Sequence, residues 1–252
     1  MPASPQNAST DSLEFHGHWD GFETVTRRRR SVRKFLDKPI AEKDMIDILD
    51  MGLLAPNSSN LQPFEFYWVR SPEKKKQLVE ACFSQNAAKT ARELVICVAR
   101  WDTWDDCRKE YVEWLRGEQG IPKPVMLYYE RLAKTMYSQG PLGLYGAARK
   151  VTLAATGLFR PVPRAPVSYA DMRVWAVKSA ALCCENVMLA AVAKGFDSCP
   201  MEGMDAVRVG KIAGLKGDQW DIPMVLGFGY RSERGLWGRQ WRRERSRLVK
   251  EI

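Results

Sequence analysis

The segment from Met172 to Lys194 constrains the fold more than any other part of this 252-residue chain. It is apolar nearly all round a helix, and Gly195 follows it at a position where helices commonly end. Lys178, Glu185 and Asn186 interrupt the apolar run, which favours a buried core helix over a membrane span. A helix without a continuous polar face needs burial on more than one side, so the rest of the chain has to enclose it.

Shorter patterns on both sides of this segment predict helices and strands. Helical patterns cover residues 22–30, 41–54, 72–83 and 205–213, and strand-like runs cover residues 64–69, 94–99 and 224–230. Strands separated by one or more helices are typical of the α+β class. We therefore expect a central sheet core with surrounding helices.

Length and composition bound the domain organisation. With 45% hydrophobic residues, the chain can bury one sizeable core. We predict a disordered polar tail over residues 1–21 and one domain over residues 22–252. Within that domain, residues 101–170 are the least regular part, Trp-rich at first and Pro-rich towards the end. They are predicted to form a helical insertion that could cover a site as a lid.

One apolar run inside this insertion, Val151–Phe159, has basic residues on both sides. It is too short to span a membrane. Two interpretations stay open: a packed lid helix, or a segment that lies on a membrane surface with its cations towards anionic headgroups.

The chain carries a formal net charge of +9. Part of the excess is concentrated in two arginine-rich runs, residues 27–34 and 239–247. Such a balance attracts nucleic acid, anionic lipid or phosphate-bearing cofactors, and it does not choose among them. The six cysteines form no C-x-x-C pair and there are only two histidines, which argues against a metal site or a disulfide framework. The cysteine usage and the lack of a signal-peptide pattern indicate a reducing, cytoplasmic location.

A phosphate-binding cluster is suggested at the end of the first predicted helix. Arg29, Arg30, Ser31 and Arg33 fall within five residues. Guanidinium groups donate paired hydrogen bonds to phosphate oxygens, and a hydroxyl adds a further one. The alternative is an ordinary basic helix end, since cations suit a helix C-terminus.

Three further segments could contact a ligand. Residues 56–63 form a loop of amides and hydroxyls that could line the edge of a heteroaromatic ring, or could only satisfy their own turn. Residues 195–203 end in a Pro-Met-Glu-Gly turn that could present backbone N–H groups, or could be a plain connector. The arginines of residues 239–247 could form a second phosphate arm, a nucleic-acid arm or a solvated end.

Together and in this order, these segments resemble the FMN-dependent nitroreductase family. The matching pieces are R-R-S-V-R-K-F, A-P-N-S-S-N-L-Q-P-F, C-P-M-E-G after the long apolar helix, the late strand V-L-G-F-G-Y and the basic C-terminal stretch. The resemblance covers residues from about 25 to 100 and from 172 to 250, and it leaves the insertion unmatched. The combination is specific for the family and says little about the substrate.

The resemblance implies an α+β sheet core in an intertwined homodimer, with one FMN at each subunit boundary. Arg29 and Ser31 would hold the FMN phosphate, with Arg30 beside them. Arg33 would lie near N1 and O2 of the flavin ring, where a cation stabilises negative charge.

The other implied FMN contacts come from four places. The contacts to the FMN of the other subunit would be Pro56, Asn57, Ser58 and Asn60. The ring edge would meet Asn86, in preference to Gln85. The N5 edge would lie beside Pro200, Glu202 and Gly203. Further phosphate contacts would be Arg245 and Arg247, although Arg242 and Arg243 are equally well placed in the sequence.

The implied activity is that of an FMN-dependent oxidoreductase. It would take hydride from NADH or NADPH and reduce a small flat acceptor, such as a nitroaromatic or a quinone, by a ping-pong mechanism in which the flavin carries the chemistry. One alternative is a specialised member of the family, a reductive dehalogenase or a flavin-consuming enzyme. The other is a basic nucleic-acid or membrane-surface binding protein. We expect no metal and no nucleic-acid partner.

Overall fold

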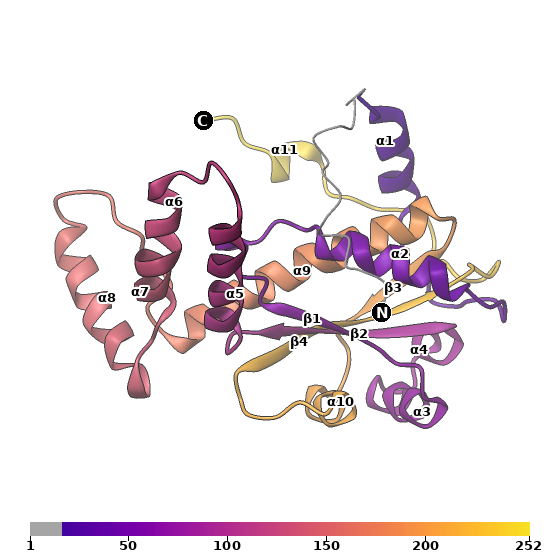
Figure 1. Cartoon of the computed structure of the whole chain (residues 1–252). Coiled ribbons are helices and arrows are strands. Elements are labelled where there is room, and N and C mark those ends of the chain that lie inside the picture. The colour runs from indigo at the N-terminus through magenta and orange to yellow at the C-terminus, as the bar shows by residue number, and fades with distance from the viewer. Residues whose placement is uncertain (1–16) are drawn as a thin grey trace.

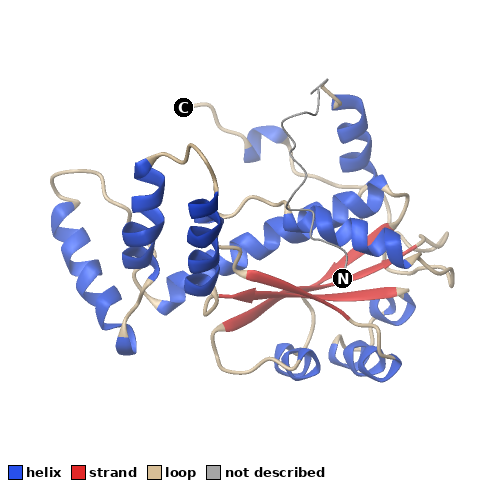
Figure 2. Cartoon of the chain, in the orientation of Figure 1, coloured by secondary structure: helices blue, strands red, loops and turns tan. Residues whose placement is uncertain are grey.

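A four-stranded sheet with helices on both faces forms the centre of the computed structural model, which describes residues 17–252 (Figure 2). The strands are β1 (Phe64–Trp68), β2 (Glu93–Arg100), β3 (Asp197–Met201) and β4 (Trp220–Gly229). Their order is β1-β2-β4-β3, and each neighbouring pair is antiparallel. The two inner strands, β2 and β4, carry the most deeply buried residues, which confirms the predicted α+β fold with a sheet core.

The long apolar segment forms helix α9 (Tyr169–Ala193) against one face of the sheet (Figure 1). Ser168 caps its first turn by accepting a hydrogen bond from the Asp171 N–H (3.1 Å), and Gly195 follows its end with a φ of +86°. Among residues 17–252 it is the one helix long and apolar enough to cross a membrane, but it packs on the sheet and on α2 (Glu42–Leu53). The predicted core helix is confirmed.

The remaining helices of the core surround this arrangement. Helices α3 (Pro72–Ala81), α4 (Asn86–Thr90) and α10 (Ala206–Ala213) lie on the sheet face opposite α2 and α9, as Figure 1 shows. Helix α1 (Trp19–Arg28) and the short α11 (Arg245–Leu248) lie on the α9 side. Of the predicted tail at residues 1–21, the first 16 residues lie outside the described part, and α1 already begins at Trp19 rather than at Phe22.

Strand β3 was not expected from the sequence, which was interpreted as a turn or connector over residues 195–203. The segment instead pairs with β4, with Pro200 opposite Leu226. Pro200 lacks an N–H and is tolerated because β3 is an edge strand with a ladder on one side only. The turn is confined to Glu202 and Gly203 at the end of this strand.

The insertion forms a helical lobe at one end of the sheet, at the left of Figure 1. Its elements are α5 (Trp104–Gly117), α6 (Lys123–Leu127), a π-helical turn (Tyr128–Leu132), α7 (Ala133–Tyr137), a short turn (Pro141–Gly143) and α8 (Leu144–Thr156). The insertion is therefore more regular than its sequence indicated. That it acts as a lid stays a prediction.

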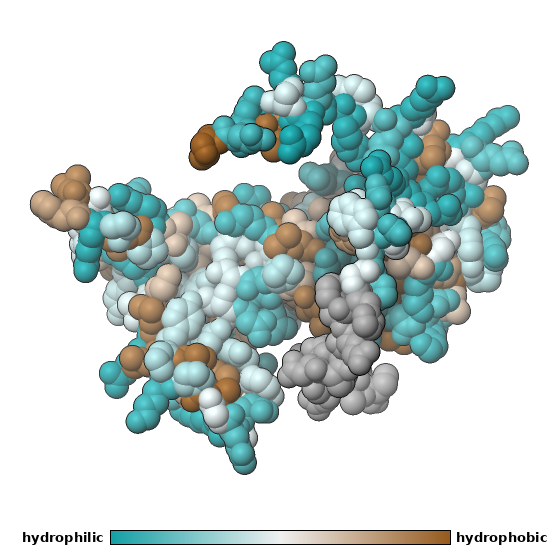
Figure 3. Space-filling model, turned by 90° about the horizontal axis from the view of Figure 1, so that it is seen from above, coloured by the Kyte–Doolittle hydropathy of each residue, from teal (hydrophilic) through white to brown (hydrophobic). Residues whose placement is uncertain are grey.

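In the single chain, helix α8 and the turn that follows it leave apolar side chains unpacked, so neither interpretation of residues 151–159 is decided. Val151, Leu158 and Phe159 keep 72%, 80% and 89% of their surface exposed, and Gly146 is the one buried residue of the helix. Figure 3 shows apolar side chains exposed over this lobe. Arg149 points inward, because its guanidinium donates to the carbonyls of Ser138 (3.1 Å) and Pro166 (2.8 Å). It is therefore not available as a cation for a membrane surface.

Candidate functional site

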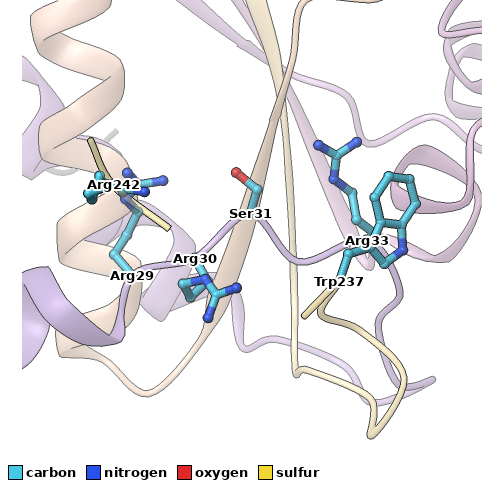
Figure 4. A pocket seen from close by; sticks show the side chains of 6 residues that line it. All are labelled: Arg29, Arg30, Ser31, Arg33, Trp237 and Arg242. Atoms are coloured by element: carbon cyan, nitrogen blue, oxygen red, sulfur yellow. The ribbon is translucent and has the colours of Figure 1, made fainter. Parts of the chain in front are cut away.

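The predicted phosphate cluster gathers around one cavity beside the edge strand β3. Arg29, Arg30, Ser31 and Arg33 line a cavity of about 290 Å³. Figure 4 shows Arg29 on one side of Ser31 and Arg33 on the other. The backbone of this segment is fixed to β3, because Ser31 bridges Ser198 and the Val32 N–H donates to the Ser198 carbonyl (2.9 Å). We call these four residues the arginine–serine cluster.

An ion pair holds the start of the cluster in place. The Arg231 guanidinium donates to both carboxylate oxygens of Asp197, with Nη2–Oδ1 at 2.5 Å and Nε–Oδ2 at 3.3 Å. The same guanidinium donates to the carbonyl of Arg28 at 3.4 Å, where α1 ends. Asp197 is buried, with 3% of its side chain exposed, so this bidentate contact links α1 firmly to β3.

The segment after β4 closes the cavity from the other side. The Arg33 N–H donates to the Gly235 carbonyl (2.7 Å), and the Arg30 guanidinium donates to the Gly238 carbonyl (3.1 Å). The Arg33 guanidinium lies 4.7 Å from the centre of the Trp237 ring, a cation–π contact. Trp237 thus holds the Arg33 side chain at the wall of the cavity.

Arg242 completes the lining of this cavity. The sequence pointed first to Arg245 and Arg247, which lie in the exposed helix α11 and do not line it. From sequence position alone, Arg242 was an equally good candidate for a phosphate contact, whereas no sequence pattern pointed to Trp237. Both come to the cavity through the path of the chain after β4.

The cavity is strongly positive. Four arginines line it, and within residues 17–252 the nearest carboxylate to any of them is Glu185, with its Oε1 3.8 Å from the Arg29 Nε. Burial raises the pKa of the nearby Cys199 thiol, and the positive charge of Arg33 acts in the opposite direction. This cysteine is therefore a neutral, buried side chain and no nucleophile.

The predicted ring-edge residues also lie together. The Gln85 side-chain amide donates to the Gly203 carbonyl (3.0 Å) and to the Cys82 carbonyl (3.1 Å). Asn86 is next to Gln85 and opens α4, while Glu202 and Gly203 leave the end of β3. Asn86, Glu202 and Gly203 are exposed, so their polar groups can reach a ligand that lies along this edge.

The loop over residues 56–60 is at the opposite edge of the sheet, where it leads into β1. Ser59, Asn60 and Gln62 have φ values of 58°, 48° and 43°, in the left-handed region that non-glycine residues rarely occupy. The Asn57 side-chain oxygen stabilises this loop by accepting the Gln62 N–H (2.8 Å). Backbone strain of this kind clusters at functional sites, where surrounding contacts maintain it.

Two cavities adjoin this loop, and neither shares a lining residue with the arginine-lined cavity. One, of about 570 Å³, includes Pro56, Asn57 and Asn60. The other, of about 480 Å³, includes Asn57 and Ser58 and is lined by residues of the insertion and of α9. A single chain therefore separates the predicted site into two parts, one beside β3 and one beside β1.

The comparisons with known proteins agree on one family. The model of the nitroreductase family matches residues 26–230. Among curated proteins, YfkO of Bacillus subtilis, whose name is that of an NAD(P)H nitroreductase, is 28% identical over 211 residues, covering 81% of this chain and 85% of its own.

Solved structures show the same fold. YdfN of Bacillus subtilis, named as a nitroreductase, superposes with a TM-score of 0.74 at 22% identity, covering 93% of this chain and all of that one. A protein of Exiguobacterium sibiricum, also named as a nitroreductase and solved in complex with FMN, gives a TM-score of 0.61 at 23% identity, covering 88% of this chain and 93% of that one.

Proposed function

The chain belongs to the nitroreductase family, and from this premise we propose that it is an FMN-dependent oxidoreductase. In this proposal it oxidises NADH or NADPH and reduces a small flat acceptor, a nitroaromatic or a quinone, by a ping-pong mechanism. The observation that carries this proposal is the cavity lined by four arginines and Ser31. The name of YfkO supports the nicotinamide donor, and the FMN complex of the Exiguobacterium protein supports the cofactor. Membership of an enzyme family sets aside the alternative of a basic binding protein.

The residues of the cavity fit the phosphate of FMN. A phosphate monoester carries a charge of about −1.5 to −2 at neutral pH and offers three acceptor oxygens. Four guanidinium groups and one hydroxyl supply charge-assisted donors around the cavity. Within residues 17–252, the four arginines that line it form no ion pair shorter than the 3.8 Å contact between Arg29 and Glu185. The sequence contains no G-x-G-x-x-G turn for a dinucleotide pyrophosphate, so FMN is favoured over FAD.

Bound FMN would supply the hydride and electron chemistry of both half-reactions. The residues of the chain would bind and orient the partners. Arg29, Arg30, Ser31 and Arg242 would hold the phosphate, and Arg33, fixed by Trp237, would stabilise negative charge on the ring. The edge formed by Asn86, Pro200, Glu202 and Gly203 would face the reacting side of the ring.

A homodimer with shared sites is part of the proposal. Under it, Pro56, Asn57, Ser58 and Asn60 of one chain would reach the FMN held by the arginines of the second chain. The separation of the two parts at opposite edges of the sheet supports this arrangement. So does α9, where Val174 and Leu182 keep 54% and 48% of their surface exposed in a single chain. We also propose a cytoplasmic location, because all six cysteines are free thiols.

The test of this function has two stages. The protein is first purified and denatured, and the released flavin is identified by mass; we expect FMN, and FAD or no flavin after reconstitution contradicts the proposal. The FMN-loaded protein is then assayed with NADH and NADPH against nitroaromatic and quinone acceptors. We expect parallel lines in double-reciprocal plots, the signature of a ping-pong mechanism. Failure of every acceptor with FMN bound would favour a specialised member of the family.

A further inference from the structure

Two tyrosines of the insertion are hydrogen-bonded to the serines of the loop that precedes β1. The Tyr137 hydroxyl lies 3.0 Å from the Ser58 Oγ and 3.0 Å from the Ser59 Oγ. The Tyr128 hydroxyl lies 2.6 Å from the Ser59 Oγ. The four hydroxyls therefore form one chain in the order Ser58, Tyr137, Ser59, Tyr128, and we call it the hydroxyl chain.

The hydroxyl chain has more hydrogens than it uses. Each of its four hydroxyls carries one hydrogen and can also accept. The three hydrogen bonds of the chain use three hydrogens, and these side chains donate to no other acceptor within residues 17–252. At least one O–H is thus available to a further acceptor. If all bonds run in the same direction, that O–H is at one end, on Ser58 or on Tyr128.

All four hydroxyl-bearing residues line the same cavity of about 480 Å³. The other walls are mostly apolar or aromatic, and they include Met136, Val174, Trp175 and Leu182. Two charged residues of α9 also line it: Asp171 accepts the Val167 N–H (2.8 Å), and Lys178 forms no ion pair within 4.0 Å in the described part of the chain. The cavity thus combines apolar and aromatic walls with several polar donors, of which the hydroxyl chain supplies one. Such a lining suits a flat molecule that carries an oxygen acceptor.

On the basis of the function proposed above, we propose that this cavity binds the electron acceptor, and that Tyr128, at the end of the hydroxyl chain, donates to a nitro or carbonyl oxygen. Tyr137 is then a positioning residue, because it holds both serines of the chain. Asn57 and Ser58, which would reach the FMN of the second subunit, line the same cavity, so an acceptor bound there adjoins that FMN. A phenol is a stronger hydrogen-bond donor than an aliphatic alcohol such as serine, because the aromatic ring withdraws electron density from its O–H group.

The test measures binding without turnover. Oxidised, FMN-loaded protein is equilibrated with nitrobenzene or with toluene, which has a ring of the same size and no oxygen, and the Kd is measured by equilibrium dialysis in the absence of nicotinamide. In the double variant Tyr128→Phe/Tyr137→Phe, we expect the Kd of nitrobenzene to rise about two- to twelvefold, the range for one neutral hydrogen bond. The Kd of toluene should stay unchanged.

The matched control is Tyr145→Phe. This phenol belongs to the same lobe and is exposed, but within residues 17–252 its hydroxyl forms no hydrogen bond, and it does not line this cavity. We expect this control to leave both Kd values unchanged. Because Tyr137 is buried and its loss could impair folding, the single variant Tyr128→Phe, with a half-buried side chain, is measured as well.

Two outcomes overturn the assignment. Either the Kd of nitrobenzene does not change in the tyrosine variants, or the Kd values of nitrobenzene and toluene change together, as a general distortion of the cavity would cause. The FMN content of each preparation separates this inference from the proposed function. Wild-type protein that binds no FMN contradicts the function itself, whereas full FMN occupancy with an unchanged Kd of nitrobenzene contradicts only the role of the hydroxyl chain.

Discussion

Arg29 and Glu185 are neighbouring side chains whose removal should change the affinity for FMN in opposite directions. Arg29 Nε lies 3.8 Å from Glu185 Oε1, and the two side chains are 21% and 45% exposed. If the cavity binds the FMN phosphate, Arg29 is a donor to it, and Glu185 competes with the phosphate for that arginine. Removing Arg29 should weaken FMN binding, and neutralising Glu185 should strengthen it.

The magnitudes follow from burial. A hydrogen bond to a charged group contributes about 1.5–3 kcal/mol, so Arg29→Ala should raise the Kd of FMN about 10- to 150-fold. Glu185 is nearly half exposed and its ion pair is long, so its interaction is in the range of about 0–1 kcal/mol for surface pairs. Glu185→Gln should therefore lower the Kd by about fivefold at most.

The assay is titration of the flavin-free protein with FMN, followed by flavin fluorescence. Arg160→Ala is the matched control, because it removes the same charge from an exposed residue of the insertion lobe. The effect of Arg29→Ala should persist at high salt, whereas that of Glu185→Gln should diminish as salt screens the exposed pair. Equal affinity of Arg29→Ala and the wild type would refute the assignment of the phosphate site.

Three further predictions concern the ring, the scaffold and the assembly. Arg33→Ala should lower the flavin midpoint potential, measured by a dye-coupled titration, with a smaller loss of FMN affinity than Arg29→Ala, because the cation stabilises the more negative reduced form; an unchanged potential would contradict its place beside the ring. Asp197→Ala should reduce the free energy of unfolding in urea by about 3 kcal/mol, since it leaves Arg231 without its buried partner; a loss below about 1 kcal/mol would mean that the pair contributes little. Light scattering should give twice the 28.7 kDa chain mass for the FMN-loaded protein, and an active, FMN-loaded monomer would refute the shared site. Asn60→Asp should reduce FMN occupancy without unfolding the chain.

The sequence by itself determined those elements that depend on local pattern. Helix α9 was predicted from the apolar period of residues 172–194 and the residues that cap it. Strands β1 and β2 were predicted from the runs of β-branched and aromatic residues at 64–69 and 94–99. All three predictions agree with the structure to within three residues at each end. The arginine–serine cluster could also be predicted from the sequence, because its four residues lie within five consecutive positions and therefore stay close together in any fold.

Only the tertiary structure decided features that join distant segments. Residues 197–201 contain a proline and form a strand because all five pair with β4, while the opposite edge carries only the isolated bridge from Ser31 to Ser198. Arg242, rather than Arg245 or Arg247, lines the cavity because residues 235–238 are fixed to Arg33 and Arg30 through backbone carbonyls. The hydroxyl chain joins residues 69–79 positions apart. No local sequence pattern predicts such contacts. Each forms only when packing of the core brings together two segments that are far apart in the sequence, and their spacing follows no helical or strand period.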